Sequence, residues 1–169
     1  MSAWRKYLIV SITVILLGGC SKGPWFGNEV PDATKLPSTL GLTLLADKDI
    51  NPNGENVASP LAFQVILMSE DSKLLAADYD QLTAKEMKDV LGKNYIDHQD
   101  FTLLPGQYKY IQPAELDSKV RYVGIAAYYS QPNGAQWKKV LKLAPIGHNY
   151  QVLVHLHKAD VDMRKESED

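Results

Sequence analysis

The chain has 169 residues, of which 45% are hydrophobic and 22% are charged, and this composition excludes a disordered protein and favours one compact domain. The formal net charge of -2 and the lack of a run of basic residues argue against nucleic-acid binding. The single cysteine, Cys20, excludes an intrachain disulfide and a structural site built from paired thiolates.

Residues 1–19 have the organisation of a secretory signal peptide. Two basic residues, Arg5 and Lys6, precede an uncharged and mostly apolar stretch over residues 7–17, and two glycines follow that stretch. At 1.5 Å per residue the stretch covers about 17 Å, whereas the hydrocarbon core of a bilayer is roughly 30 Å thick. A permanent transmembrane helix is therefore the disfavoured alternative, and we predict a signal peptide over residues 1–19.

The end of this segment, Leu17-Gly18-Gly19-Cys20, resembles the bacterial lipobox. The resemblance implies that Cys20 carries an S-diacylglycerol and an N-acyl chain and begins the mature lipoprotein; the alternative is an incidental free thiol. Two or more acyl chains make a stable membrane anchor. In such lipoproteins an aspartate directly after the cysteine would imply retention in the inner membrane. This chain has Ser21 at that position, which implies delivery to the outer membrane. We expect no cofactor besides this covalent lipid.

The residues that follow Cys20 have the composition of a tether. Residues 21–38 are rich in Gly, Pro and polar side chains and show no sustained period of hydrophobic residues. A coil of this length spans on the order of 20–24 Å, so a tethered domain would stay near the membrane. We therefore assign residues 20–38 to the acylated cysteine and a flexible tether.

Two strands and a long connection are predicted at the start of the folded domain. Apolar residues alternate over residues 39–47, and residues 61–68 have apolar side chains on both faces. The connection over residues 48–60 contains two prolines and an Asn-Gly pair, and it is far longer than a hairpin turn requires. A loop of this length in a compact domain is usually either functional or disordered.

The hydrophobic period becomes helical after the second strand. Leu75, Tyr79 and Leu82 have the spacing of one helix face, and a second short helix is predicted to end at Gly92. We expect Thr83 and Glu86 to form the capping box of that second helix. The pattern therefore predicts a short helical insertion in a mainly β fold.

Turn signals separate the remaining strand signals, which lie over residues 100–104, 108–111, 120–129, 137–143 and 150–156. In the last of these strands, four apolar residues share one face: Tyr150, Val152, Val154 and Leu156. Seven strands with apolar faces predict a two-sheet β-sandwich over residues 39–163. We expect the charged residues 164–169 to form a frayed tail.

Motifs that carry chemistry are scarce in the chain. His155 and His157 would lie on one face of the last strand, but no third ligand is evident, so we predict a solvated polar face and no metal site. No nucleophile lies in a recognisable motif, and we interpret the acidic residues of the helical insertion as a solvated helix face. We therefore expect no enzymatic activity.

Several short motifs are similar in order and spacing to those of a known family. Besides the lipobox cysteine they are Ile50-Asn51-Pro52, Ser59-Pro60, Asp78-Tyr79, Leu91-Gly92, Leu103-Leu104-Pro105-Gly106-Gln107, Val123-Gly124-Ile125-Ala126-Ala127-Tyr128 and Trp137-Lys138-Lys139-Val140. Together they resemble TssJ, the outer-membrane lipoprotein family of the bacterial type VI secretion system, also called VasD or SciN-like. Lys138 departs from the arginine that family members often carry after the tryptophan.

The resemblance implies a transthyretin-like β-sandwich that is not an enzyme and faces the periplasm from the outer membrane. The implied partner is the periplasmic part of the inner-membrane protein TssM, with TssL in the same complex and TssA as a further candidate. The family contacts its partner through the loop between the first two strands, where Ile50 and Val57 are candidate apolar anchors. In this chain the implied partner-binding residues are Lys48, Asp49, Ile50, Asn51, Pro52, Asn53, Gly54, Glu55, Asn56 and Val57.

An alternative function is that of an outer-membrane lipoprotein that carries a small apolar ligand, because a β-sandwich can hold such a ligand between its sheets. A copurified ligand would support this alternative. Neighbouring genes for secretion sheath, tube and inner-membrane assembly proteins would favour the anchoring function.

Overall fold

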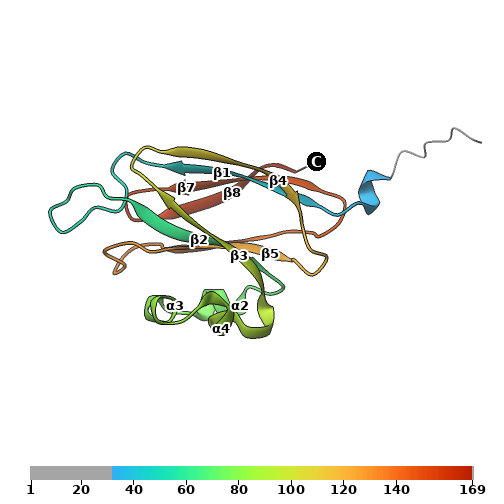
Figure 1. Ribbon diagram of the computed structural model, residues 1–169, viewed down its shortest axis with the longest axis horizontal. Helices are drawn as coiled ribbons and strands as arrows, with labels where there is room; N and C mark the ends of the chain where they lie inside the picture. Colours follow the sequence, from blue (N-terminus) through green and yellow to red (C-terminus); the bar gives the residue numbers. More distant parts are fainter. Residues whose placement is uncertain (1–31, 169) are drawn as a thin grey trace, which may run out of the picture. The chain divides into compact units, whose positions relative to one another are not determined.

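The computed structural model describes residues 32–168, and within them the fold is mainly β (Figure 1). Two four-stranded sheets have the strand orders β4-β1-β7-β8 and β3-β2-β5-β6. The strands are β1 (Thr39–Ala46), β2 (Leu61–Met68), β3 (Tyr95–Leu103), β4 (Tyr108–Glu115), β5 (Tyr122–Ala127), β6 (Lys138–Lys142), β7 (Asn149–Leu156) and β8 (Val161–Glu168). The predicted two-sheet β-sandwich is therefore confirmed.

Three of the predicted features lie wholly or partly outside the described residues. They are the signal peptide over residues 1–19, the lipidation site Cys20 and the first part of the tether. Among residues 32–168, no helix combines the length and the apolar character needed to cross a membrane.

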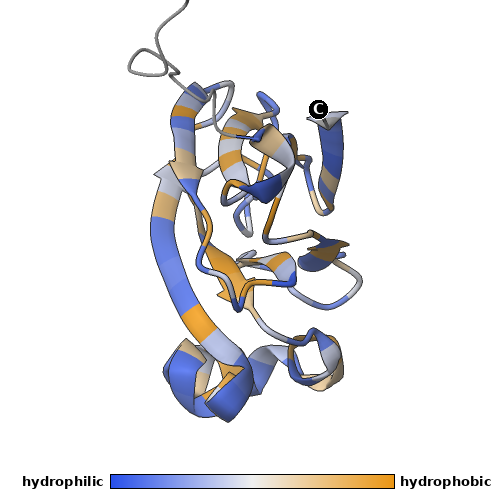
Figure 2. Cartoon of the chain, turned by 90° about the vertical axis from the view of Figure 1, so that its right-hand side faces the viewer, coloured by the Kyte–Doolittle hydropathy of each residue, from blue (hydrophilic) through white to orange (hydrophobic). Residues whose placement is uncertain are grey.

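The inward faces of both sheets form one hydrophobic core. Along β1 every second side chain is buried, from Leu40 to Ala46, and β7 runs parallel beside it with Leu44 opposite Val154. The four residues predicted to share the inner face of the last strand are all buried, which confirms that prediction: Tyr150, Val152, Val154 and Leu156. The alternation of hydrophobic and hydrophilic residues along the strands is visible in Figure 2.

The predicted helical insertion follows β2 and covers the outer face of the β3-β2-β5-β6 sheet (Figure 1). Hydrophobic residues from the helices and the sheet form a second cluster there, which includes Leu74, Leu91 and Ile66. Gly124 of β5 permits the close approach, since a Cβ atom at that position would lie 2.6 Å from a methyl carbon of Leu74. The insertion consists of α2 (Ser72–Ala76), α3 (Tyr79–Ala84), α4 (Met87–Leu91) and the 3-10 helix η3 (Gly92–Asn94).

The capping box lies one helix earlier than predicted. The Asp78 carboxylate accepts a hydrogen bond from the backbone N–H of Gln81 at 2.8 Å, and the Gln81 side-chain oxygen accepts one from the Asp78 N–H at 3.4 Å. Thr83 lies inside α3, where its hydroxyl donates to carbonyls of its own helix, and Glu86 pairs with Lys88 at 2.7 Å. The predicted Thr83–Glu86 box is wrong because Thr83 belongs to α3, which ends at Ala84, and the residue that precedes α4 is Glu86.

The charged C-terminal residues form a strand. β8 pairs antiparallel with β7, and its two apolar residues, Val161 and Met163, are buried in the core. The ammonium group of Lys165 lies 4.7 Å from the centre of the Tyr150 ring. The prediction of a frayed tail over residues 164–169 is therefore wrong for the described part, although this strand is predominantly hydrophilic (Figure 2).

The folded domain begins before the predicted end of the tether. A short 3-10 helix, η2 (Ala33–Lys35), is followed by a β-bridge between Pro37 and Ile146. The backbone N–H of Gly147 donates to the Leu36 carbonyl at 2.9 Å. The assignment of residues 32–38 to a flexible tether is therefore wrong, because their backbone groups pair with the connection between β6 and β7.

Candidate functional site

Four connections meet at one end of the sandwich. The β1–β2 loop protrudes there, at the left of Figure 1, while η2 lies at the opposite end of the domain. Hydrogen bonds join this loop to its neighbours: Gly106 N–H to the Asp47 carbonyl at 3.0 Å, Asn51 N–H to the Lys158 carbonyl at 3.2 Å and Ser130 N–H to the Asn51 side chain at 2.7 Å. The four connections, at residues 47–60, 104–107, 128–137 and 157–160, therefore form one surface.

Asn51 fixes the base of the β1–β2 loop. Its side chain is 5% exposed and uses both polar atoms, since it accepts from the Ser130 N–H and donates to the Pro60 carbonyl at 2.8 Å. The Ser59 hydroxyl donates to the Asn51 carbonyl. The backbone of Asn51 has φ of 45°, a left-handed conformation that asparagine tolerates better than most residues.

Asn53 closes the tip of the same loop. Its side-chain oxygen accepts hydrogen bonds from the backbone N–H groups of Glu55 and Val57, both at 3.0 Å. Its own N–H donates to the Val57 carbonyl at 2.9 Å. The exposed tip therefore has a defined conformation that is maintained by an Asx-type turn.

The predicted partner-binding residues fall into two groups. Ile50 is fully buried in the main core and Asn51 is nearly so, and Pro52 is half-buried. The expectation that Ile50 is an apolar anchor for a partner is wrong, because its side chain packs inside the domain. Val57 is 56% exposed and stays a candidate anchor. The exposed residues of the predicted set are Lys48, Asp49, Asn53, Gly54, Glu55, Asn56 and Val57.

A cluster that the sequence did not reveal lies at the root of this loop. The Asp47 carboxylate bridges two imidazoles, with Oδ1 2.7 Å from His155 Nε2 and Oδ2 2.8 Å from His157 Nδ1. Partial burial acts to raise the pKa of Asp47, but the hydrogen bonds from His157 and His155 outweigh it and hold that pKa below its usual range. The sequence predicts that the two histidines belong to a solvated polar face. That prediction is incomplete, because both imidazoles are hydrogen-bonded to the Asp47 carboxylate.

Tyr129 joins two of the connections inside the domain. Its hydroxyl donates to the carbonyls of His157 at 3.0 Å and Asp160 at 2.7 Å, and its side chain is buried. Burial raises the pKa of the Tyr129 phenol well above its usual value. The β7–β8 turn is thereby held against the β5–β6 connection.

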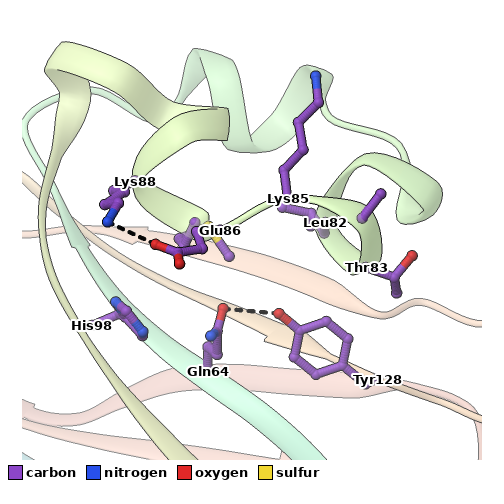
Figure 3. Close-up of a pocket in the computed structure, with 10 residues that line it drawn as sticks. Gln64, Leu82, Thr83, Lys85, Glu86, Lys88, His98 and Tyr128 are labelled. Carbon is purple, nitrogen blue, oxygen red and sulfur yellow. Dashed lines mark hydrogen bonds and ion pairs between the residues drawn. The ribbon is translucent and has the colours of Figure 1, made fainter.

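A separate cleft of about 620 Å³ lies between the helical insertion and the outer face of the second sheet (Figure 3). Two pairs of its polar groups interact: the Tyr128 hydroxyl donates to the Gln64 side chain at 2.8 Å, and Lys88 pairs with Glu86. The hydrogen bond from Lys88 lowers the pKa of Glu86. Each of these four side chains therefore already has a partner within the cleft.

A smaller cavity of about 250 Å³ opens between the two sheets beside β3 and β4. Its apolar lining includes Leu40, Leu42, Val65 and Ile111. Pockets that bind small molecules generally have volumes of about 300–1,000 Å³. The size of this cavity therefore does not favour the alternative function as a carrier of an apolar ligand.

Comparisons with known proteins agree with this architecture. Residues 38–159 match the family model described as type VI secretion lipoprotein, VasD, EvfM and TssJ. The type VI secretion lipoprotein TssJ1 from Pseudomonas aeruginosa is 25% identical, with 78% of this chain and 98% of that chain covered and a TM-score of 0.71. The comparison with curated proteins finds no match.

Two further similar structures show the same fold. Serratia marcescens Lip, a membrane-bound component of the type VI secretion system, is 24% identical, with 78% of this chain and 99% of that chain covered and a TM-score of 0.68. A chain in a structure described as the TssM C-terminal domain from EAEC is 20% identical, with 75% and 97% covered and a TM-score of 0.63.

Proposed function

Because the chain belongs to the type VI secretion lipoprotein family that includes TssJ and VasD, we propose that it anchors the membrane complex of such a system in the outer membrane. In this proposal, acyl chains on Cys20 hold the protein in the membrane, with the domain facing the periplasm. The partner at the other end of the domain is the periplasmic part of TssM, which connects it to TssL in the inner membrane, and TssA is a further candidate. Such a role needs an anchor and a scaffold and no catalytic group.

The observation that carries the proposal is the position of the β1–β2 loop relative to the point where the chain enters the domain. The described chain begins beside η2, at the end of the domain opposite this loop (Figure 1). The eight residues of β1 connect the two ends and span about 26 Å. A membrane attachment at one end therefore leaves the loop directed away from it and accessible to a periplasmic partner.

The loop also has the properties of a binding element. Asn51 and Asn53 hold its base and tip in one conformation, so little conformational entropy is lost when a partner binds. Val57 offers an exposed apolar side chain, and Asp49 and Glu55 add exposed charged side chains to the same loop. Interfaces of this kind depend on a few anchor residues, and Val57 is the first candidate for one.

The partner assignment can be tested by the substitution Val57→Asp in the full-length protein, with the periplasmic part of TssM as the binding partner. We expect the affinity to fall by at least about tenfold, because a charge replaces an apolar anchor. Ile146→Asp is the matched control: Ile146 is 51% exposed, similar to Val57, and lies on the β6–β7 connection at the other end of the domain. Equal affinities for the two variants would contradict the loop assignment.

The anchor can be tested by Cys20→Ser. We expect this variant to lose metabolic labelling with palmitate, to be absent from the outer-membrane fraction and to stop type VI secretion. Mass spectrometry of the native protein should show the added mass of a diacylglycerol and an acyl chain on Cys20. An unmodified thiol in the native protein, or normal secretion by the serine variant, contradicts the anchoring role.

A further inference from the structure

Three side chains at the root of the β1–β2 loop have the donor set of a metal site. One oxygen of Asp47, one ring nitrogen of His155 and one of His157 all lie within 4.8 Å of one another. Two imidazole nitrogens and one carboxylate oxygen are typical ligands of Zn²⁺, which takes three protein ligands in sites that keep a fourth position open. We propose that these three residues bind a zinc ion on the outer face of the β4-β1-β7-β8 sheet.

The distances are compatible with this ligand set after a small adjustment. Two ligands at 2.0–2.1 Å from a tetrahedral zinc ion are about 3.3 Å apart. The Asp47 oxygens are now 2.7 Å and 2.8 Å from the ring nitrogens, so each pair must separate by about half an ångström to admit the ion. The side chains of Asp47, His155 and His157 are 37%, 24% and 36% exposed, which leaves room for this movement and a path for the ion.

The backbone holds the three ligands in place. β1 and β7 pair in parallel, with Leu45 opposite His155 and Ala46 opposite Leu156, so Asp47 follows directly beside His157. The Asp47 N–H donates to the Leu156 carbonyl at 2.9 Å, and its carbonyl accepts from the N–H groups of Ile50 and Gly106. His155 lies on β7, and Asp47 and His157 directly follow paired strands, so a site made of these ligands loses little entropy on binding.

The surroundings also favour a cation. The ring centres of His155 and His157 are only 3.9 Å apart, and both rings present a nitrogen to the same carboxylate. Asp162 of β8 lies opposite His155 in the antiparallel register, so it shares the outer face and adds a second carboxylate beside the site. Zinc would replace the hydrogen atoms that now lie between the ring nitrogens and the carboxylate.

Zinc at this position would stabilise the start of the β1–β2 loop. Asp47 is the last residue before the exposed loop residue Lys48, His155 lies near the end of β7 and His157 directly follows that strand. A bound ion would therefore connect the root of the loop to the centre of the sheet. Zinc binding at this position is independent of the proposed function, so measurements of metal binding alone test it.

The test is isothermal titration of the untagged full-length protein in detergent with zinc chloride, supported by the visible spectrum with Co²⁺. We expect one zinc ion per chain and a higher melting temperature in its presence. Asp47→Asn and His155→Gln should each weaken binding by at least about tenfold, because each removes one ligand. The matched control His98→Gln removes a histidine of the second sheet and should bind zinc like the unaltered protein.

Each outcome of these measurements either supports or contradicts the zinc site. Saturable binding that depends on Asp47 and His155 but not on His98 supports the site, as does a Co²⁺ spectrum with the intense bands of a four-coordinate ion. Absence of zinc binding by the unaltered protein, or equal binding by His155→Gln, overturns it and leaves the cluster as a hydrogen-bonded group. If a variant fails to fold, the Co²⁺ spectrum and the zinc-dependent melting temperature of the unaltered protein still give the answer.

Discussion

The backbone N–H of Ser130 donates a 2.7 Å hydrogen bond to the side-chain oxygen of Asn51, a residue 79 positions earlier in the chain. The side-chain NH2 group of Asn51 donates to the Pro60 carbonyl, so one buried side chain satisfies polar groups from two different connections. The base of the β1–β2 loop is therefore part of the domain, and only its tip is free to contact other molecules.

Asn51→Ala should lower the free energy of unfolding by about 2–4 kcal/mol, because it leaves two buried polar groups without partners and places alanine at a positive φ. Urea denaturation measures this loss. Asn56→Ala is the control, because Asn56 has a similar φ of 62° but is exposed, and it should cost about 1 kcal/mol. Similar losses in both variants would show that the buried hydrogen bonds contribute little.

Tyr129→Phe should lower the free energy of unfolding by about 1–3 kcal/mol near pH 8, because the carbonyls of His157 and Asp160 lose their shared donor. The folded-state pKa of Tyr129 is raised by burial above the usual value of 10.0. The contribution of Tyr129 to the free energy of unfolding is therefore complete below about pH 10. It is lost as the pH rises above that value.

The measurement is urea denaturation of both proteins at pH 8 and at pH 10.5. We expect the difference between the unaltered protein and Tyr129→Phe to be smaller at the higher pH, since the other tyrosines and lysines are common to both. A difference that stays constant or grows with pH is inconsistent with a buried, hydrogen-bonded phenol.

Lys138 of β6 caps the end of helix α2 from the neighbouring sheet. Its ammonium group donates to the carbonyls of Leu74 at 3.1 Å, Leu75 at 2.6 Å and Ala77 at 2.6 Å. Burial lowers the pKa of the Lys138 ammonium group. Lys138→Met should cost about 1.5–3 kcal/mol and increase hydrogen exchange in α2, because charged donors make strong hydrogen bonds. Lys142→Met, at the exposed end of β6, should change neither quantity, and equal effects would refute the capping role.

Deletion of residues 163–169 should destabilise the domain by at least about 2 kcal/mol, because it removes the buried side chain of Met163 and most of the β7–β8 ladder. Thermal unfolding of the truncated protein measures this loss. Deletion of residues 168–169 alone is the control and should have little effect. A truncated protein as stable as the full chain would show that β8 does not contribute to folding.

Local patterns were sufficient where a strand has one clearly apolar face. The alternation of leucines predicted β1, the run of apolar residues predicted β2 with its observed bounds, and the inner face of β7 was assigned correctly. Gly92 ends α4 with φ of 55°, as predicted. In these segments burial follows the strand or helix period, so the sequence alone is sufficient to predict the element and its buried face.

The missed features depend on contacts between distant segments. β8 has only two buried apolar residues among charged ones, and the first half of β3 is largely polar, so neither has a strong alternating pattern. Ile50 lies in a loop, and only the packing of the loop base shows that it is a core residue. The Asp47 cluster requires the parallel pairing of β1 with β7, which no local period can indicate.

The position of β1 has a mechanical consequence for the proposed role as a link between two membranes. β1 lies between β4 and β7, hydrogen-bonded on both sides, with residues 32–38 preceding Thr39 at one end and the exposed loop following Ala46 at the other. A force between these attachments would pass along the covalent backbone of β1 itself, so the load would not have to cross the hydrogen bonds between strands. Such a domain should resist extension in this direction much more strongly than a pull across its sheets.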